Sequence, residues 1–153
     1  MPEMEQKRVL AIASGGGHWQ QLMRLRPAFE KQSPTYVTTN AAYASDVPGS
    51  DLFVVTDANR DRPLKLILAA VEMLFRVVRV RPDVVISTGA APGLFGIIFG
   101  RLVGARTIWV DSIANAEAIS LSGRIASRFA HVVLTQWPHL AQPGGPQYHG
   151  SIL

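Results

Sequence analysis

Short apolar runs alternate with helical patterns along the chain, and this alternation predicts its fold. Runs rich in Val, Ile and Leu predict buried strands at 8–13, 35–38, 52–55, 83–86, 106–110 and 131–135. Apolar residues spaced three and four apart predict helices at 19–30, 63–80, 93–103 and 121–129. Strands that alternate with helices indicate βαβ units, so we expect an α/β fold: a single Rossmann-like domain with a parallel sheet.

The chain has 153 residues, a usual length for one such domain, and no linker or internal repeat divides it. Residues 138–153 are rich in proline and glycine, which predicts an irregular tail. Parallel sheets bind ligands at the carboxyl ends of their strands. The loops expected at that edge are 14–18, 40–44, 56–62, 87–92, 111–115 and 136–139.

A glycine-rich loop, Ser14-Gly15-Gly16-Gly17-His18, joins the first predicted strand to the first predicted helix. Glycines let main-chain N–H groups approach an anion, and the start of a helix adds positive potential. A pyrophosphate or a carboxylate is therefore one candidate ligand, and a tight turn without a ligand is the alternative. The spacing matches neither the dinucleotide fingerprint, whose third glycine would fall at Gln20, nor a P-loop.

Two side chains at this edge are candidates for chemistry. His18 stands at the start of a helix, where it can orient a phosphate or accept a proton from a hydroxyl, or simply cap or pack. Asp111 follows a predicted strand, and its carboxylate can accept a proton or bind a sugar hydroxyl. The chain has no cysteine, and its histidines lack the spacing of metal ligands, so we expect no metal site.

Basic residues gather in the middle of the chain. Net charge is +4, and six cations lie in one segment: Arg60, Arg62, Lys65, Arg76, Arg79 and Arg81. Such a patch suits phosphate groups, either of lipid headgroups or of nucleic acid. Aromatic residues do not alternate with these cations as a base-stacking surface requires, so we do not expect nucleic acid as a partner.

The predicted helix around residues 64–80 has more apolar surface than a sheet needs to be covered. Its polar residues, Lys65, Glu72, Arg76 and Arg79, fall within about 60° of one another around the helix axis. The remaining apolar flanks predict contact with a membrane surface, with a partner protein or with other parts of the fold. No uncharged run reaches the ~18 residues of a membrane span, and residues 1–8 do not form a signal peptide, so the expected location is cytoplasmic.

Four segments, in this order, carry a resemblance to a known family. They are 14–18 with Leu22 and Leu25 behind it, 81–93, 109–113 with 120–124, and 135–138 leading to 148–152. Together they resemble the acceptor-side, membrane-associated subunit of the two-subunit N-acetylglucosaminyltransferase of dolichol-linked oligosaccharide synthesis. They look closer still to its bacterial relatives in exopolysaccharide and capsule synthesis. The family is similar to the N-terminal half of GT-B glycosyltransferases, which implies that fold here.

The resemblance implies half of an inverting glycosyltransferase, which transfers a sugar from a UDP-sugar to a polyprenyl-diphosphate-linked saccharide. This half would bind the acceptor and the membrane surface, as a peripheral protein on the cytoplasmic face, and a second subunit would bind the UDP-sugar. No cofactor or metal is implied. Eukaryotic members carry an N-terminal membrane anchor, and we expect none in this chain. The alternatives are a non-catalytic membrane scaffold that activates the partner, and a Rossmann domain for an unrelated small molecule.

Site residues follow from the resemblance by position. His18 and Asp111 would be catalytic, one of them as the base, although many relatives carry Glu where this chain has Asp111. Contact with the membrane would fall to Lys65, Arg76 and Arg79. The residues that would bind substrate are Ser14, Gly15, Gly16, Gly17, Thr88, Gly89, Ser112 and Asn115.

Overall fold

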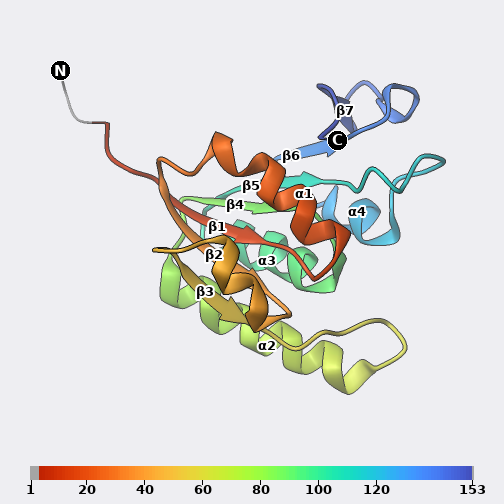
Figure 1. Cartoon of the computed structure of the whole chain (residues 1–153). Helices are drawn as coiled ribbons and strands as arrows, with labels where there is room; N and C mark the ends of the chain where they lie inside the picture. Colours follow the sequence, from red (N-terminus) through yellow and green to blue (C-terminus); the bar gives the residue numbers. More distant parts are fainter. Residues whose placement is uncertain (1–3, 153) are drawn as a thin grey trace.

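Among the described residues, seven parallel strands form one sheet, with helices packed on it (Figure 1). The computed structural model describes residues 4–152, so residues 1–3 of the polar N-terminal segment and the last residue of the predicted tail lie outside the described part. The strand order is β3-β2-β1-β4-β5-β6-β7. This order reverses direction between β1 and β4, and sheets of this kind bind ligands where it does so.

Six strands coincide with the predicted apolar runs to within two residues. The inner strands are buried on both faces by helices, which is why they are continuous apolar runs rather than alternating ones. The strands are β1 (Arg8–Ile12), β2 (Ser33–Thr38), β3 (Asp51–Val54), β4 (Val84–Ser87), β5 (Arg106–Val110), β6 (Val132–Thr135) and β7 (Gln147–Tyr148).

Helices cover both faces of the sheet (Figure 1). On one face lie α2 (Pro63–Val80), α3 (Ala90–Leu102) and α4 (Leu121–Ala126), and on the other lie α1 (Gly17–Leu25) and the 3-10 helix η2 (Ala41–Asp46). The first predicted helix, 19–30, is shorter than expected and continues as the 3-10 helix η1 (Arg26–Ala28). Pro27 explains this, because it lacks an N–H to donate to the preceding turn.

The predicted irregular tail is partly ordered, which corrects the sequence interpretation. It contains the 3-10 helix η3 (Pro138–Leu140) and β7, which pairs with β6 through Leu134 and Gln147. Both residues of β7 are exposed, so this edge strand has no apolar run that would have predicted it.

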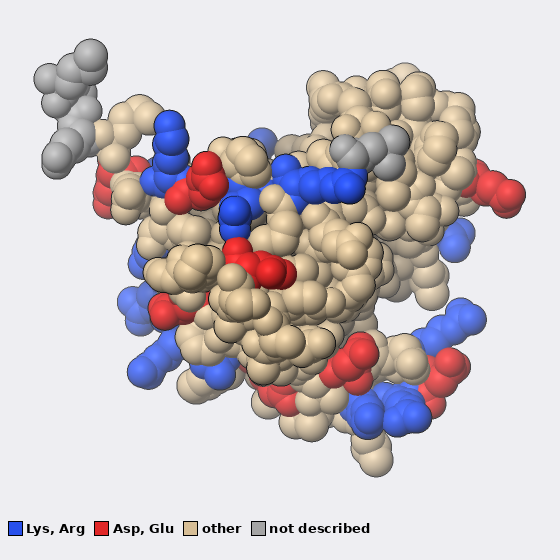
Figure 2. Space-filling model, in the orientation of Figure 1, with Lys and Arg blue, Asp and Glu red and all other residues tan. Residues whose placement is uncertain are grey.

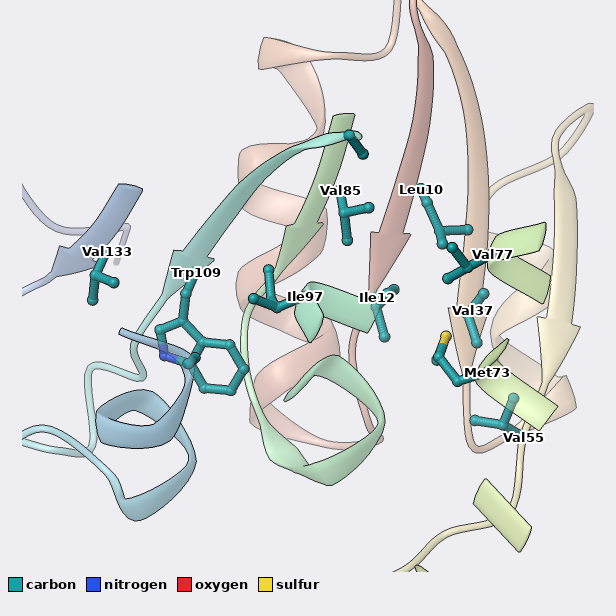
Figure 3. Packing of buried hydrophobic residues seen from close by; sticks show 12 residues of the cluster. Leu10, Ile12, Val37, Val55, Met73, Val77, Val85, Ile97, Trp109 and Val133 are labelled. Atoms are coloured by element: carbon teal, nitrogen blue, oxygen red, sulfur yellow. The ribbon is translucent and has the colours of Figure 1, made fainter. Parts of the chain in front are cut away.

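Apolar side chains of β1 pack against those of α2 and α3 on one face of the sheet. Leu10 and Ile12 of β1 form one cluster with Met73 and Val77 of α2 and Ile97 of α3 (Figure 3). All five are fully buried. Burial of this kind stabilises by about 1.5–3 kcal/mol per large side chain, and it fixes both helices relative to the strand that precedes the glycine loop.

Glycines of α3 bring this helix close to the sheet. A Cβ added to Gly96 would overlap Ile12 Cδ1, and one added to Gly100 would lie 2.6 Å from Val85 Cγ2. A side chain at either position would therefore push α3 away from the sheet. The N-terminus of α3 is held beside that of α1, at the point where the strand order reverses.

Candidate functional site

His18 and Thr88 connect the two loops at the switch point of the sheet. The His18 Nδ1 atom lies 3.0 Å from the Thr88 carbonyl oxygen, and the Thr88 hydroxyl donates to the His18 carbonyl oxygen at 2.6 Å. A carbonyl oxygen can only accept, so Nδ1 carries the ring proton in this contact. In the neutral ring of the half-buried His18, Nε2 is then the nitrogen without a proton, and it can accept one.

Thr88 and Gly89 lie beneath this histidine instead of lining an open cleft. The Thr88 side chain is fully buried, and its hydroxyl donates its hydrogen bond to the His18 carbonyl oxygen. Gly89 has φ +140, and a Cβ there would be 2.5 Å from His18 Nδ1. The Thr88 hydroxyl therefore supports His18, and the substrate contact expected at Thr88 and Gly89 stays a prediction.

The glycine loop is held partly by side chains of the segment after β2. The Gly15 N–H donates to Thr39 Oγ1 at 3.2 Å, and the Gly16 N–H donates to Tyr43 Oη at 2.8 Å. Ser14 is buried. The N–H groups in the first turn of a helix have no partner within that helix. Gly17 and His18 are the first two residues of α1, so their N–H groups are the candidates for binding an anion.

Asp111 accepts four hydrogen bonds in a buried position. Trp109 Nε1 and Ser120 Oγ donate to one carboxylate oxygen at 3.0 and 2.6 Å. Asn115 Nδ2 and the Ser120 N–H donate to the other at 3.2 and 3.0 Å. Two donors on each oxygen fill the acceptor capacity of a carboxylate. This geometry favours a role for Asp111, and for Asn115 with it, in fixing the loop that follows β5.

Two glutamines that the sequence analysis missed support the same loop from α1 and β6. Gln21 Oε1 accepts from the Ile113 N–H at 3.1 Å and from Gln136 Nε2 at 2.6 Å. Gln21 Nε2 donates to Ser112 Oγ at 3.1 Å, so the Ser112 hydroxyl, predicted to bind substrate, is engaged internally. A glutamine on the inward face of α1, between the buried Trp19 and Leu22, was the available signal.

The outward face of α2 is a continuous apolar surface. Its side chains are between 42% and 82% exposed: Leu64, Ile67, Leu68, Val71, Leu74, Phe75 and Val78. Basic and acidic side chains lie side by side at the end of the molecule where α2 begins (Figure 2). We call these seven residues the outer α2 face. Over the described residues, no helix combines the length and the apolar character that crossing a membrane requires.

The three predicted membrane contacts differ in their surroundings. Lys65 and Arg79 are exposed. Arg76 is half-buried, with its guanidinium carbon 3.9 Å from the centroid of the Phe53 ring. Glu72, on the same stripe, accepts from the Thr56 N–H and hydroxyl at 2.7 and 2.6 Å. Glu72 and Arg76, two residues of the polar stripe of α2, therefore pack against β3 and the residues that follow it, at the edge of the sheet.

Comparison with solved structures gives the class of the fold. The domain is similar to MurG of Acinetobacter baumannii, with a TM-score of 0.76 and 16% identity over 93% of this chain and 45% of that one. It is also similar to UDP-N-acetylglucosamine 2-epimerase of Rickettsia bellii, with a TM-score of 0.68 and 16% identity over 88% and 40%. It thus has the Rossmann-like fold of the GT-B class and spans less than half of either chain.

Sequence comparison identifies the family. The family model described as "Oligosaccharide biosynthesis protein Alg14 like" matches residues 53–152, and the chain belongs to this family. It is 25% identical to the UDP-N-acetylglucosamine transferase subunit ALG14 of Yarrowia lipolytica, over 99% of this chain and 84% of that protein. It is 34% identical to the same subunit of Eremothecium gossypii, over 48% and 36%.

These findings confirm the predicted family and the predicted fold. The curated relatives are fungal, so they do not support the expected closer likeness to bacterial exopolysaccharide enzymes. The match to the family model begins after the glycine loop, whereas the alignment with the Y. lipolytica subunit covers nearly the whole chain.

Proposed function

We propose that this domain is the acceptor-binding half of an inverting glycosyltransferase that transfers a sugar from a UDP-sugar to a polyprenyl-diphosphate-linked saccharide. The observation that carries this proposal is His18, held by Thr88 at the switch point with Nε2 as its unprotonated nitrogen. The family supports the substrate class. The relatives' name, UDP-N-acetylglucosamine transferase subunit, supports N-acetylglucosamine as the sugar that is transferred.

In the proposed reaction, His18 acts as the base. Its Nε2 accepts the proton of the acceptor hydroxyl while that oxygen forms a bond to C1 of the donor sugar. The bond from C1 to the UDP oxygen breaks, the electron pair leaves with UDP, and the configuration at C1 is inverted. The Thr88 carbonyl, which accepts from Nδ1–H, stabilises the imidazolium that forms.

Asp111 has a supporting role in this proposal. Its two oxygens already accept from Trp109, Ser120 and Asn115, so no lone pair is left for a substrate proton. We therefore propose that it fixes the loop after β5, and that Gly17 and His18 contribute the amides that face the acceptor phosphates.

The outer α2 face is proposed as the contact with the cytoplasmic face of the membrane, as in a peripheral protein. Its apolar side chains would enter the boundary between headgroups and acyl chains, and Lys65 and Arg79 would meet anionic headgroups. The Arg76 guanidinium packs over the Phe53 ring, so it would contribute less to binding headgroups.

A second subunit is proposed to supply the donor site, because this chain spans less than half of the GT-B structures that it resembles. The test measures sugar transfer to a polyprenyl-diphosphate-linked saccharide by this chain, by the partner and by the pair. UDP-N-acetylglucosamine, UDP-glucuronate and UDP-galactose serve as donors. Transfer by the pair alone, with UDP-N-acetylglucosamine preferred, is the expected result.

Transfer by the partner alone would instead support the second candidate, a non-catalytic membrane scaffold. The observation in favour of that candidate is that the side chains of Thr88, Ser112 and Asn115, predicted to bind substrate, form hydrogen bonds within the domain itself. Transfer by this chain alone would contradict both proposals.

A further inference from the structure

Two side chains of the segment that follows β2 accept hydrogen bonds from the glycine loop. Thr39 accepts from the Gly15 N–H, and Tyr43 accepts from the Gly16 N–H at 2.8 Å. Gly16 has φ +70, a conformation that glycine adopts without strain. Because successive glycines have great conformational freedom, a side-chain acceptor on this amide selects one arrangement of the loop.

The Tyr43 ring is itself held in place. It stacks on Trp19 with the ring centroids 4.8 Å apart and the planes 18° from parallel. Trp19 is buried, and its Nε1 donates to Asp46 at 2.8 Å, at the end of η2. The Asn40 side chain caps the start of η2 by accepting from the Ala42 N–H at 3.0 Å. Tyr43 thus projects from a short helix that is fixed at both ends.

The hydrogen bond between Tyr43 and Gly16 lies close to His18 in the chain. The Tyr43 hydroxyl holds Gly16, and Gly16 is the cap of α1, whose first two residues are Gly17 and His18. A shift of Gly16 would therefore move the amides of Gly17 and His18, while Thr88 would still hold the His18 ring from the other side. The two supports act on different parts of the site.

We infer that Tyr43 is a positioning residue for the acceptor: its hydroxyl sets the direction of the Gly17 and His18 amides toward the acceptor's phosphate groups. The inference rests on the proposed function, and it assigns Tyr43 no contact with the reacting atoms. Thr39 assists by holding Gly15.

The test replaces Tyr43→Phe, which keeps the stack on Trp19 and removes only the hydroxyl. Loss of one hydrogen bond to the loop is expected to raise the acceptor KM of the reconstituted pair about five- to tenfold. The donor KM and the melting temperature should stay unchanged. Tyr148→Phe, on the exposed edge strand β7, is the matched control and should have no effect.

Amide hydrogen exchange of this chain gives a readout that does not depend on activity. Tyr43→Phe should speed exchange at Gly16 about tenfold and leave the strands unaffected. Thr39→Val, which removes the hydroxyl, should speed exchange at Gly15. Thr39→Ser, which keeps it, should leave exchange at Gly15 as slow as in the wild type.

Two results would overturn the inference. The first is unchanged exchange at Gly16, and the second is an unchanged acceptor KM. If the acceptor KM is unchanged and the melting temperature is lower, the role of Tyr43 is purely structural. A wild-type pair that transfers no sugar would reject the proposed function, and with it the role toward the acceptor. The exchange result would still decide separately whether Tyr43 holds the loop.

Discussion

His18 and Asp111 stand at the same edge of the sheet but in opposite surroundings. One ring nitrogen of His18 contacts a carbonyl oxygen, and in the neutral ring the other nitrogen carries a lone pair, on which its proposed role as the base depends. Both oxygens of Asp111 are occupied by donors inside the fold. A side chain whose acceptor capacity is filled supports structure, and one with an available lone pair can take part in proton transfer.

Replacing Asp111→Asn tests this distinction at the residue scale. The amide group would face N–H and O–H donors that now meet a carboxylate, so we expect the free energy of unfolding to fall by about 1–3 kcal/mol. The turnover number per folded molecule should fall less than about tenfold. Denaturant unfolding and transfer by the reconstituted pair measure the two effects. A loss of turnover of 100-fold or more, on the order expected for a general base, at unchanged stability would show that Asp111 is the base.

At the scale of elements, the surface of α2 has three parts, two of which contact the rest of the domain. Ala69, Met73 and Val77 pack against the sheet, Arg76 and Glu72 close the sheet edge beside β3, and the outer α2 face remains exposed. An exposed apolar surface of this length is unusual for a protein that is monomeric in water. It is the physical basis for the proposed membrane contact.

Vesicle sedimentation tests the outer α2 face. The double variant Leu64→Ser/Ile67→Ser removes two exposed apolar side chains and should weaken binding to vesicles of anionic lipid at least about tenfold. The control Leu121→Ser/Ile125→Ser removes a comparable exposed pair from α4 and should bind as the wild type does. Equal binding by all three proteins would reject this face as the membrane contact.

Much of this arrangement of elements could be predicted from the sequence, because apolar periodicity reports burial directly. The six longer strands and the start of α2 at Pro63 are examples. The edge strand β7 has no such pattern. The roles of Thr88, Gln21 and Tyr43 depend on hydrogen bonds across 70, 92 and 27 residues, and no local pattern reveals those contacts.

On the scale of the whole molecule, one ion pair links the starts of the two strands that flank the switch point. Arg8 donates its main-chain N–H to Asp83 Oδ2 at 2.8 Å, and its guanidinium lies 3.4 Å from Oδ1. The main-chain N–H of Arg8, followed by its side chain, lowers the pKa of Asp83 below its usual 3.8. A lowered carboxyl pKa stabilises the fold above the ordinary pKa, and that contribution is lost as pH falls through the depressed value.

The replacement Asp83→Asn should therefore reduce the stability of the domain at pH 7 and have less effect in acid, once the pH has fallen through the lowered pKa of Asp83. Urea unfolding at pH 7 and in acid measures the difference between variant and wild type. Asp61→Asn, in an exposed loop, is the control. A difference that is the same at both pH values would mean that the Asp83 charge does not contribute.

We propose that this domain contributes the base to a transferase completed by a second subunit. The most direct test is the turnover number of the reconstituted pair with wild-type chain and with His18→Ala, at saturating acceptor and donor. We expect a loss of about 10²–10⁴-fold, the range for removal of a general base. His149→Ala, in the exposed tail, should leave turnover unchanged. Equal turnover by wild type and His18→Ala would contradict the claim.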